Sequence, residues 1–190
     1  MRHLPAGLLD RFREAARDLP QRDDSVYARA GRDPCDPVFG LGPSDAGIAF
    51  FGRDPGRDEV HVGVPFIGAG GRQVRRVLYR RHHHGEMVDT DDALRAGEGY
   101  FWANTVPYKP EGNRAWSMRV KRQFQPLVAE VLLRLWEGRH VISLGREAFF
   151  WFGIGQGREV RQHLEHHWQS PNRFETSLSV DFAGPAGMAR

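Results

Sequence analysis

The sequence has one cysteine and almost no lysine, and its shortages exclude several classes of protein. Cys35 is the single cysteine among 190 residues, which excludes an internal disulfide and any zinc or iron–sulfur site built from several cysteines. No apolar run is long enough to span a membrane. The first residues lack the apolar core of a signal peptide, so we expect a cytoplasmic protein with no membrane partner.

The basic residues are almost all arginine, because Lys109 and Lys121 are the only lysines among 27 basic residues. The planar fork of arginine matches phosphate geometry, which favours a nucleic-acid partner. Arginine bias can equally reflect genomic base composition, and charge alone leaves both interpretations open. The length suits one domain with a proper core, and we assign residues 1–190 to a single domain.

Apolar runs alternate with amphipathic segments along the chain. Short apolar runs predict strands at 47–51, 99–106 and 140–144, with the second run at the centre of the sheet. Helical spacing predicts helices at 4–19, 67–81, 117–136, 145–152 and 160–167. Irregular connections are expected at 21–43 and 82–92, and a further strand at 177–182. This order favours an α/β fold, a three-layer α/β/α sandwich with a central, mainly parallel sheet.

The helix expected at 67–81 has an apolar side and a basic side. Val74, Val77 and Leu78 are expected to share its buried face, with the arginines elsewhere. The glycines of 153–157 are not followed by the Lys and Ser/Thr of a phosphate-binding P-loop. This argues against a phosphate-ligand protein of similar topology.

The stretch FGRDPGRDEVHVGVPFIGAGG at 51–71 follows the first apolar run. Pro55 fixes its own φ and pushes Asp54 toward an extended conformation, and Gly52 permits backbone angles that other residues resist. Ligands bind at the carboxyl ends of strands in open α/β sheets, which makes this loop a candidate site with Asp54 at its tip. Phe66 is the one large aromatic residue in the Gly/Pro-rich second half. A simple connection between two elements is the competing interpretation.

Asn104 interrupts an otherwise apolar strand. Its side chain offers one acceptor and two donors, which suits the edge of a pyrimidine, although an Asn that caps a turn at the strand end is an alternative. The loop after this strand carries cations, Pro and Gly and could touch phosphate or be simply solvated. Its candidate nucleic-acid-binding residues are Lys109, Asn113 and Arg114.

These features occur in an order that resembles the uracil-DNA glycosylase superfamily. GxDPG follows the first strand, GxPFxG precedes the first crossover helix, Asn104 precedes a Lys-Pro-x-Gly-Asn-Arg loop, and Leu144-Gly145 follows the third strand. No single motif is specific, but the ordered set is. The resemblance covers roughly 37–150 and is strongest to the bacterial branch that carries GxPFxGxxG.

The resemblance implies a role for each matching residue. Asp54 would position or activate water, Phe66 would stack on a flipped uracil, and Asn104 would bind the uracil edge and reject cytosine. Backbone amides near Arg53 and Asp54 would contact a uracil carbonyl, and Gly52 and Arg53 are candidate substrate-binding residues. The implied activity is hydrolysis of the N-glycosidic bond of uracil, or a related deaminated base, in single- or double-stranded DNA by a monomer without metal or organic cofactor. The alternative is a non-catalytic or impaired nucleic-acid-binding member of the superfamily.

The chain departs from the family pattern at the acid and at the cysteines. The bacterial branch carries its acid where this chain has Arg53, whereas Asp54 matches the uracil-specific branch with GxDPY. The Tyr of that motif excludes thymine, and Gly56 stands in its place here. The four cysteines of the iron–sulfur branch are missing, so no cluster is expected.

The family's second motif is a His-Pro-Ser loop that stabilises the uracil oxyanion, and it has no clear counterpart. The only approximation is HWQSPN at 167–172, which follows Gly145 closely. We therefore expect a domain that lacks its final strand and loop, with 177–182 leading toward them. Histidines cluster at 82–84 and at 163–167. A solvated surface accounts for such clusters more often than a metal site does, and no metal is expected.

Overall fold

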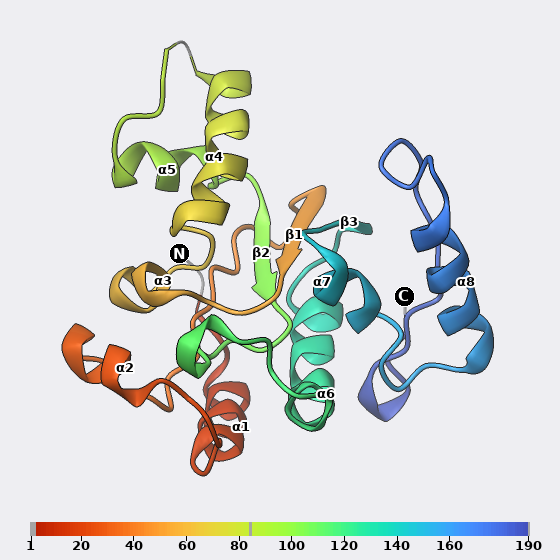
Figure 1. Ribbon diagram of the computed structural model, residues 1–190, viewed down its shortest axis with the longest axis horizontal. Coiled ribbons are helices and arrows are strands. Elements are labelled where there is room, and N and C mark those ends of the chain that lie inside the picture. The colour runs from red at the N-terminus through yellow and green to blue at the C-terminus, as the bar shows by residue number, and fades with distance from the viewer. Residues whose placement is uncertain (1–2, 84, 190) are drawn as a thin grey trace.

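A computed structural model describes residues 3–83 and 85–189 (Figure 1). The helices and strands follow in this order: α1 (Ala6–Ala16), α2 (Asp24–Ala30), β1 (Ile48–Gly52), α3 (Arg57–Val62), α4 (Ala69–His82), α5 (Thr90–Ala96), β2 (Phe101–Asn104), η1 (Glu111–Asn113), α6 (Met118–Arg134), β3 (His140–Ser143), α7 (Arg146–Trp151), α8 (Arg158–Gln169) and η2 (Pro185–Gly187). No helix in the described part of the chain is long and apolar enough to cross a bilayer.

The three strands form a parallel sheet in the order β2-β1-β3. Gly52 pairs with Asn104 on one side of β1, and Phe51 pairs with Ser143 on the other. The prediction that 99–106 is the central strand was wrong, because β1 lies between the other two among the described residues. The apolar character of β2 reflects cover by helices on both faces rather than strands on both edges, since all four of its residues are buried.

Helices cover both faces of the sheet (Figure 1). Successive side chains of each strand point to opposite faces. Phe50 and Trp102 stack at 4.6 Å between ring centroids and pack with Leu78 of α4 and Ala96 of α5. The opposite face carries the larger core, in which the strands pack with α1, α6 and α7. The predicted α/β fold with helices on both sides of a parallel sheet is confirmed.

Strand β3 is covered less completely than its neighbours. Its four residues alternate between exposed and half-buried, and Ile142 is 43% exposed. Within residues 3–83 and 85–189, β1 is the only strand that pairs with it. The strand predicted at 177–182 was wrong, because this segment is irregular. Phe182 is buried by ring contacts with Trp151 and Phe152, at 5.6 and 5.3 Å between centroids, so its hydrophobicity is satisfied without strand pairing.

Two helices lie in segments that the sequence predicted to be irregular. Helix α2 occupies part of 21–43, buries Val26 and Tyr27 against Val60 of α3, and ends at Gly31 with a φ of 63°. Helix α5 begins in the 82–92 segment, where Asp89 accepts a hydrogen bond from the Asp92 amide at 2.9 Å. Each has seven residues, and such short helices depend on tertiary packing rather than on sequence periodicity.

The buried face of α4 also differs from the prediction. Val77 is 65% exposed, whereas Gly71, Arg75 and Leu78 are the buried residues of this helix. These three positions follow the i, i+4, i+7 spacing of one helix face. The prediction failed because an arginine occupies the middle of that face and was assigned to solvent.

Candidate active site

The carboxyl ends of β1 and β2 bring the predicted residues to one edge of the sheet. Gly52 and Asn104 are register partners, and the pairing continues past both strands. The Thr105 amide donates to the Gly52 carbonyl at 2.8 Å, and the Thr105 hydroxyl donates to the Arg53 carbonyl. These bonds fix the start of the GRDPG loop against the end of β2, which places the loop where open α/β sheets bind ligands.

Asp54 is a buried acid although it belongs to a loop. Its side chain is 3% exposed, and Arg53 Nε lies 2.9 Å from its Oδ1. Apart from this ion pair, Oδ1 has no well-aligned hydrogen-bond donor among the described residues. Burial raises the pKa of Asp54 to about 6, and the charge and side-chain contact of Arg53, followed by the charges of Lys109 and Lys121, oppose the rise. The carboxyl is therefore ionised at neutral pH and has an acceptor available for a ligand or water.

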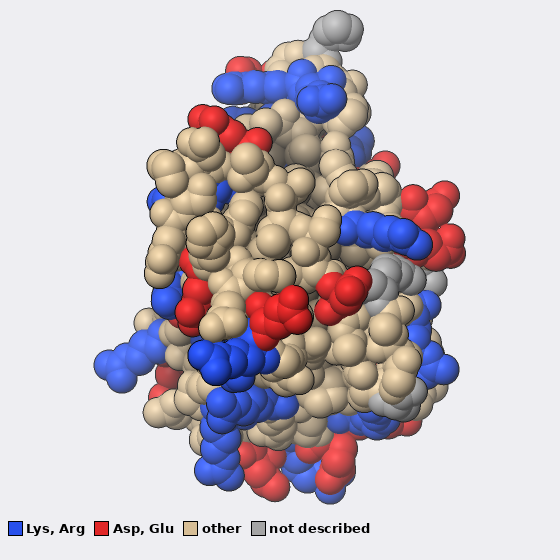
Figure 2. Space-filling model, turned by 90° about the vertical axis from the view of Figure 1, so that its right-hand side faces the viewer, with Lys and Arg blue, Asp and Glu red and all other residues tan. Residues whose placement is uncertain are grey.

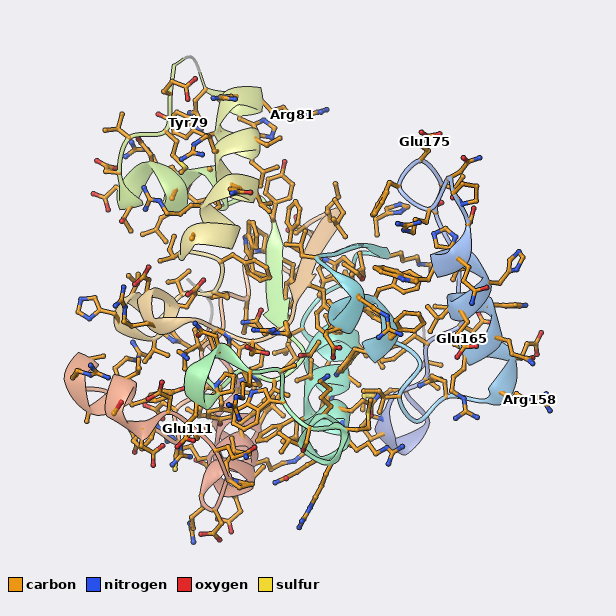
Figure 3. The ribbon with its side chains drawn as sticks, in the orientation of Figure 1. Tyr79, Arg81, Glu111, Arg158, Glu165 and Glu175 are labelled. Carbon is orange, nitrogen blue, oxygen red and sulfur yellow. The ribbon has the colours of Figure 1, made fainter. Side chains whose placement is uncertain are left out.

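Arg53 connects the acid loop to the loop after β2. Its Nη2 donates to the Asn113 carbonyl at 2.9 Å, and its side chain is 39% exposed. Asn113 is the last residue of the short helix η1 and has a φ of 56°, and both it and Arg114 are exposed; Glu111, the first residue of η1, is labelled in Figure 3. The predicted residues Asn113 and Arg114 thus lie on the same side of the sheet as Arg53, facing solvent.

Phe66 lies against the end of β1 in a left-handed backbone conformation. Its φ is 61°, a conformation that costs roughly 1–2 kcal/mol for a residue other than glycine. A Cβ on Gly52 would lie 2.5 Å from Phe66 Cζ and 3.3 Å from Asn104 Oδ1. Only a glycine lets the ring approach this closely. Gly52, Phe66 and the buried Asn104 therefore meet in space.

Glu59 joins the acid loop to the Phe66 loop, and sequence reasoning missed it. Its Oε2 accepts from the Gly56 amide at 3.0 Å and its Oε1 accepts from the Gly68 amide at 2.9 Å. Glu59 is the third residue of α3, and a Glu three residues after a helix start is a capping signal that could have identified it. Its carboxylate makes the two loops one unit.

Arg75 is the second residue that the sequence did not reveal. It is 2% exposed, and its guanidinium lies 4.2 Å from the ring centroid of Trp102. It donates to three main-chain carbonyls, those of Phe66 at 2.8 Å, Ala93 at 2.7 Å and Pro65 at 3.1 Å. Burial lowers the pKa of Arg75 to about 10, opposed by the charge of Glu59, and the side chain remains a cation at neutral pH.

Lys109 lies inside the protein rather than on a DNA-facing surface. It is 3% exposed, its Nζ donates to the Pro110 carbonyl at 2.7 Å, and Asp23 Oδ2 lies 3.5 Å away. This placement does not support a direct contact with phosphate. The residue instead contributes positive charge near Asp54.

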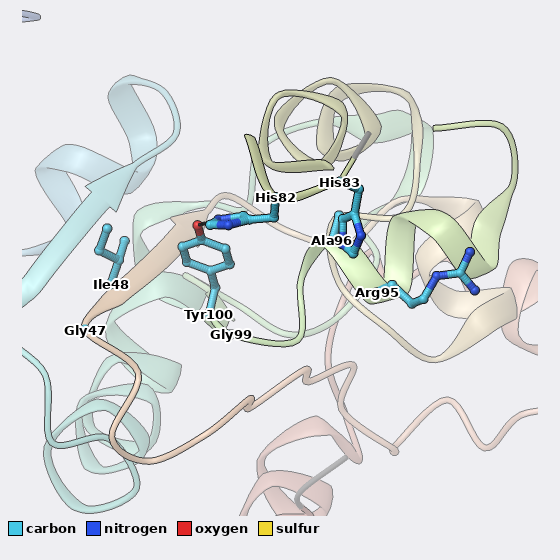
Figure 4. A pocket seen from close by; sticks show the side chains of 8 residues that line it. All are labelled: Gly47, Ile48, His82, His83, Arg95, Ala96, Gly99 and Tyr100. Atoms are coloured by element: carbon cyan, nitrogen blue, oxygen red, sulfur yellow. Dashed lines mark hydrogen bonds between the residues drawn. The ribbon is translucent and has the colours of Figure 1, made fainter. Parts of the chain in front are cut away.

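Two hollows in the described surface lie away from Asp54. One, of about 330 Å³, is bordered by Ile48 at the start of β1 and by His82, His83 and Tyr100, with His82 Nε2 2.9 Å from the Tyr100 hydroxyl (Figure 4). The other, of about 500 Å³, lies among helices α2, α3, α4 and α5. Both are open, and shape alone does not locate the chemistry.

The histidine-rich segments do not assemble a metal site in the part of the chain that the structure describes, and His84 lies outside the described residues. His167 packs against Phe149 of α7 at 5.8 Å between ring centroids. The HWQSPN run therefore ends a helix rather than following a strand. Charges of both signs are scattered over the face that includes α8 (Figure 2).

A comparison with protein families agrees with this geometry. The model of the uracil DNA glycosylase superfamily matches residues 39–180, which is 142 of 190 residues. The chain belongs to the uracil DNA glycosylase superfamily. Membership supports a glycosylase-type function in general, with DNA as the partner. No curated protein matches the chain.

Proposed function

We propose that this protein hydrolyses the N-glycosidic bond of uracil, or of a related deaminated base, in DNA. The observation that carries the proposal is the buried carboxyl of Asp54, two residues after Gly52, the residue at which Phe66 and Asn104 meet. A base inside a duplex cannot reach such a site, so the enzyme flips the nucleotide out or acts on single strands.

Base recognition is assigned to the amide and the ring. Asn104 donates from its amide nitrogen to a uracil carbonyl and accepts from the N3–H with its oxygen, a pattern that cytosine does not offer. Phe66 stacks on one face of the base. Gly56 presents no side chain toward the 5-position, and a Cβ there would meet Glu59 Oε2 at 2.7 Å. A methyl group on the base is therefore not excluded at this position, which favours a substrate range wider than uracil.

Bond cleavage is assigned to Asp54. As the bond from C1′ to the base breaks, its electron pair leaves with the base and positive charge develops on the sugar. The Asp54 carboxylate stabilises that charge and orients a water molecule, whose oxygen bonds to C1′. The attacking water releases one proton and the departing base takes up one proton, so the reaction consumes one water and leaves no net change in protons. The reaction requires the carboxylate form of Asp54, which predominates at pH values above its pKa of about 6.

A non-catalytic DNA-binding member of the superfamily is the second candidate. The observation that favours it is that the residues in 3–83 and 85–189 include no His-Pro-Ser loop after a strand. Loss of one preorganised oxyanion donor costs roughly a hundred- to a thousandfold in rate. Such a protein would retain Asn104 and Phe66 and bind uracil-containing DNA without cleaving it.

The deciding experiment is alkali-sensitive cleavage of a labelled single-stranded oligonucleotide with one uracil. Wild type is compared with Asp54→Asn, Asn104→Ala and the control Asp58→Asn, whose side chain is 54% exposed. We expect cleavage by wild type and by the control, and at least a hundredfold loss in the two site variants (~10² or more). Wild type that binds the oligonucleotide without cleaving it would establish the second candidate instead. Equal cleavage by all four proteins would refute the assignment of the site.

A further inference from the structure

We propose that Arg75 is a positioning residue that holds the ring of Phe66 in place for base stacking. It acts through the main chain, because its guanidinium binds the carbonyls of Pro65 and Phe66 rather than any part of the site that meets the base. The inference rests on the proposed function for its catalytic consequence, but its structural content can be tested without substrate.

Phe66 needs to be held, because its backbone occupies a conformation that favours glycine. At a φ of 61° the chain would relax to another conformation unless its carbonyls were fixed. Arg75 Nε binds the carbonyl of Phe66 itself at 2.8 Å, and Nη2 binds that of the preceding residue at 3.1 Å. A Cβ on Gly71 would lie 2.3 Å from the Phe66 backbone, so the first turn of α4 packs directly against the main chain of Phe66.

The setting of Arg75 is specific to this task. A buried helix face ordinarily carries an apolar residue, and a buried cation is costly unless its donors are satisfied. Arg75 satisfies its donors with carbonyls from two different segments, the one before α4 and α5. Its guanidinium packs on Trp102, and the same Trp102 ring lies 5.1 Å from that of Phe66. Arg75 therefore fixes the main chain of Phe66, and Trp102 packs against its ring.

The consequence is preorganisation of the stacking surface. A ring held against Gly52 leaves the space beside Asn104 defined before the base arrives, and a misplacement of about 1 Å can cost roughly a hundredfold in rate. Removal of Arg75 should therefore impair the reaction only through Phe66, with Asp54 and Asn104 intact.

The first test observes the ring directly. The protein is labelled with ¹³C at Cζ of phenylalanine, and the Phe66 resonance is identified by its loss in Phe66→Leu. We expect Arg75→Met to shift or split this resonance, Arg75→Lys to do so less, and Arg76→Met, at an exposed neighbouring arginine, to leave it unchanged. Should Arg75→Met not fold, Arg75→Lys carries the comparison. An unchanged Phe66 resonance in a folded Arg75 variant would overturn the inference.

The second test is a double-mutant cycle on kcat/KM for the uracil oligonucleotide. We expect Arg75→Met to lower kcat/KM about ten- to hundredfold in wild type and to have little further effect in Phe66→Leu. If the loss in kcat/KM of the double variant equals the product of the two single losses, Arg75 acts independently of Phe66. That result would refute the positioning role. If wild type cleaves no uracil substrate, the proposed function fails while the ring spectrum still decides the role of Arg75.

Discussion

Replacement of Asp54 by asparagine should stabilise the folded protein at neutral pH while it abolishes the proposed chemistry. The carboxyl is buried, and burial makes its ionisation unfavourable even though Arg53 Nε lies 2.9 Å from its Oδ1. Asparagine has nearly the same volume and no charge. The gain in stability should therefore appear only at pH values where Asp54 would be ionised.

The sign and size follow from the pKa of Asp54. In the folded state it is about 6, above the ordinary 3.8, so between these values the native protein binds more protons than the unfolded chain. The free energy of unfolding of wild type then falls as the pH rises through this window and stays lowered above 6. The interval from 3.8 to about 6, at about 1.4 kcal/mol per pH unit, corresponds to roughly 3 kcal/mol. For a chain of this size that is a shift in Tm of about 6–12 °C.

Urea unfolding of both proteins at pH 4, 5, 6, 7 and 8 measures the effect. The variant should gain on wild type by roughly 2–3 kcal/mol between pH 4 and pH 8, with unchanged m-values. The control Asp58→Asn, at an exposed carboxylate, should show little pH-dependent difference. A stability difference between Asp54→Asn and wild type that stays constant with pH would refute the reasoning, because it would mean that Asp54 ionises equally easily in both states.

Three further predictions concern the loops around the acid. Gly52→Ala should displace the Phe66 ring and lower kcat/KM roughly ten- to hundredfold in a folded protein, and near-wild-type turnover would contradict this contact. Arg53→Ala removes a charge that lowers the pKa of Asp54, so the acidic limb of the kcat/KM profile from pH 5 to 9 should move to higher pH; an unmoved limb would exclude Asp54 as the titrating group. Arg114→Ala should flatten the slope of log K against log salt by about 1 in anisotropy titrations without changing Tm, and an unchanged slope would remove Arg114 from the DNA contact.

The sequence was sufficient for elements whose pattern is strong and local. The apolar run of β1 and the long amphipathic stripe of α6 were recovered because burial alone determines their residue types. Helices α2 and α5 were missed because seven residues between Pro, Gly and Asp carry too little periodicity. Phe182 indicated a strand only because ring packing and strand pairing call for the same kind of residue.

The sequence predicted the site residues that lie at turns and strand ends, but it did not predict the residue that fixes the main chain around them. Gly52, Asp54, Phe66 and Asn104 stand at positions where a strand or loop departs from the ordinary pattern, and the structure brings Gly52, Phe66 and Asn104 together. Arg75 could not be found in this way, because a charged residue on an amphipathic helix is assigned to solvent unless the partner carbonyls are known. Three-dimensional contacts alone identify such a residue.

Because both lysines are buried, proteolysis at lysine can measure local opening of the folded protein. Lys109 and Lys121 are 3% and 5% exposed, and they are the entire lysine content of the sequence. A protease that cleaves on the amino side of lysine can therefore cut this chain only after the segments around them have opened. Lys109 reports the loop after β2 and Lys121 reports α6, so the two cleavage products distinguish a local opening beside the acid from loss of the main core.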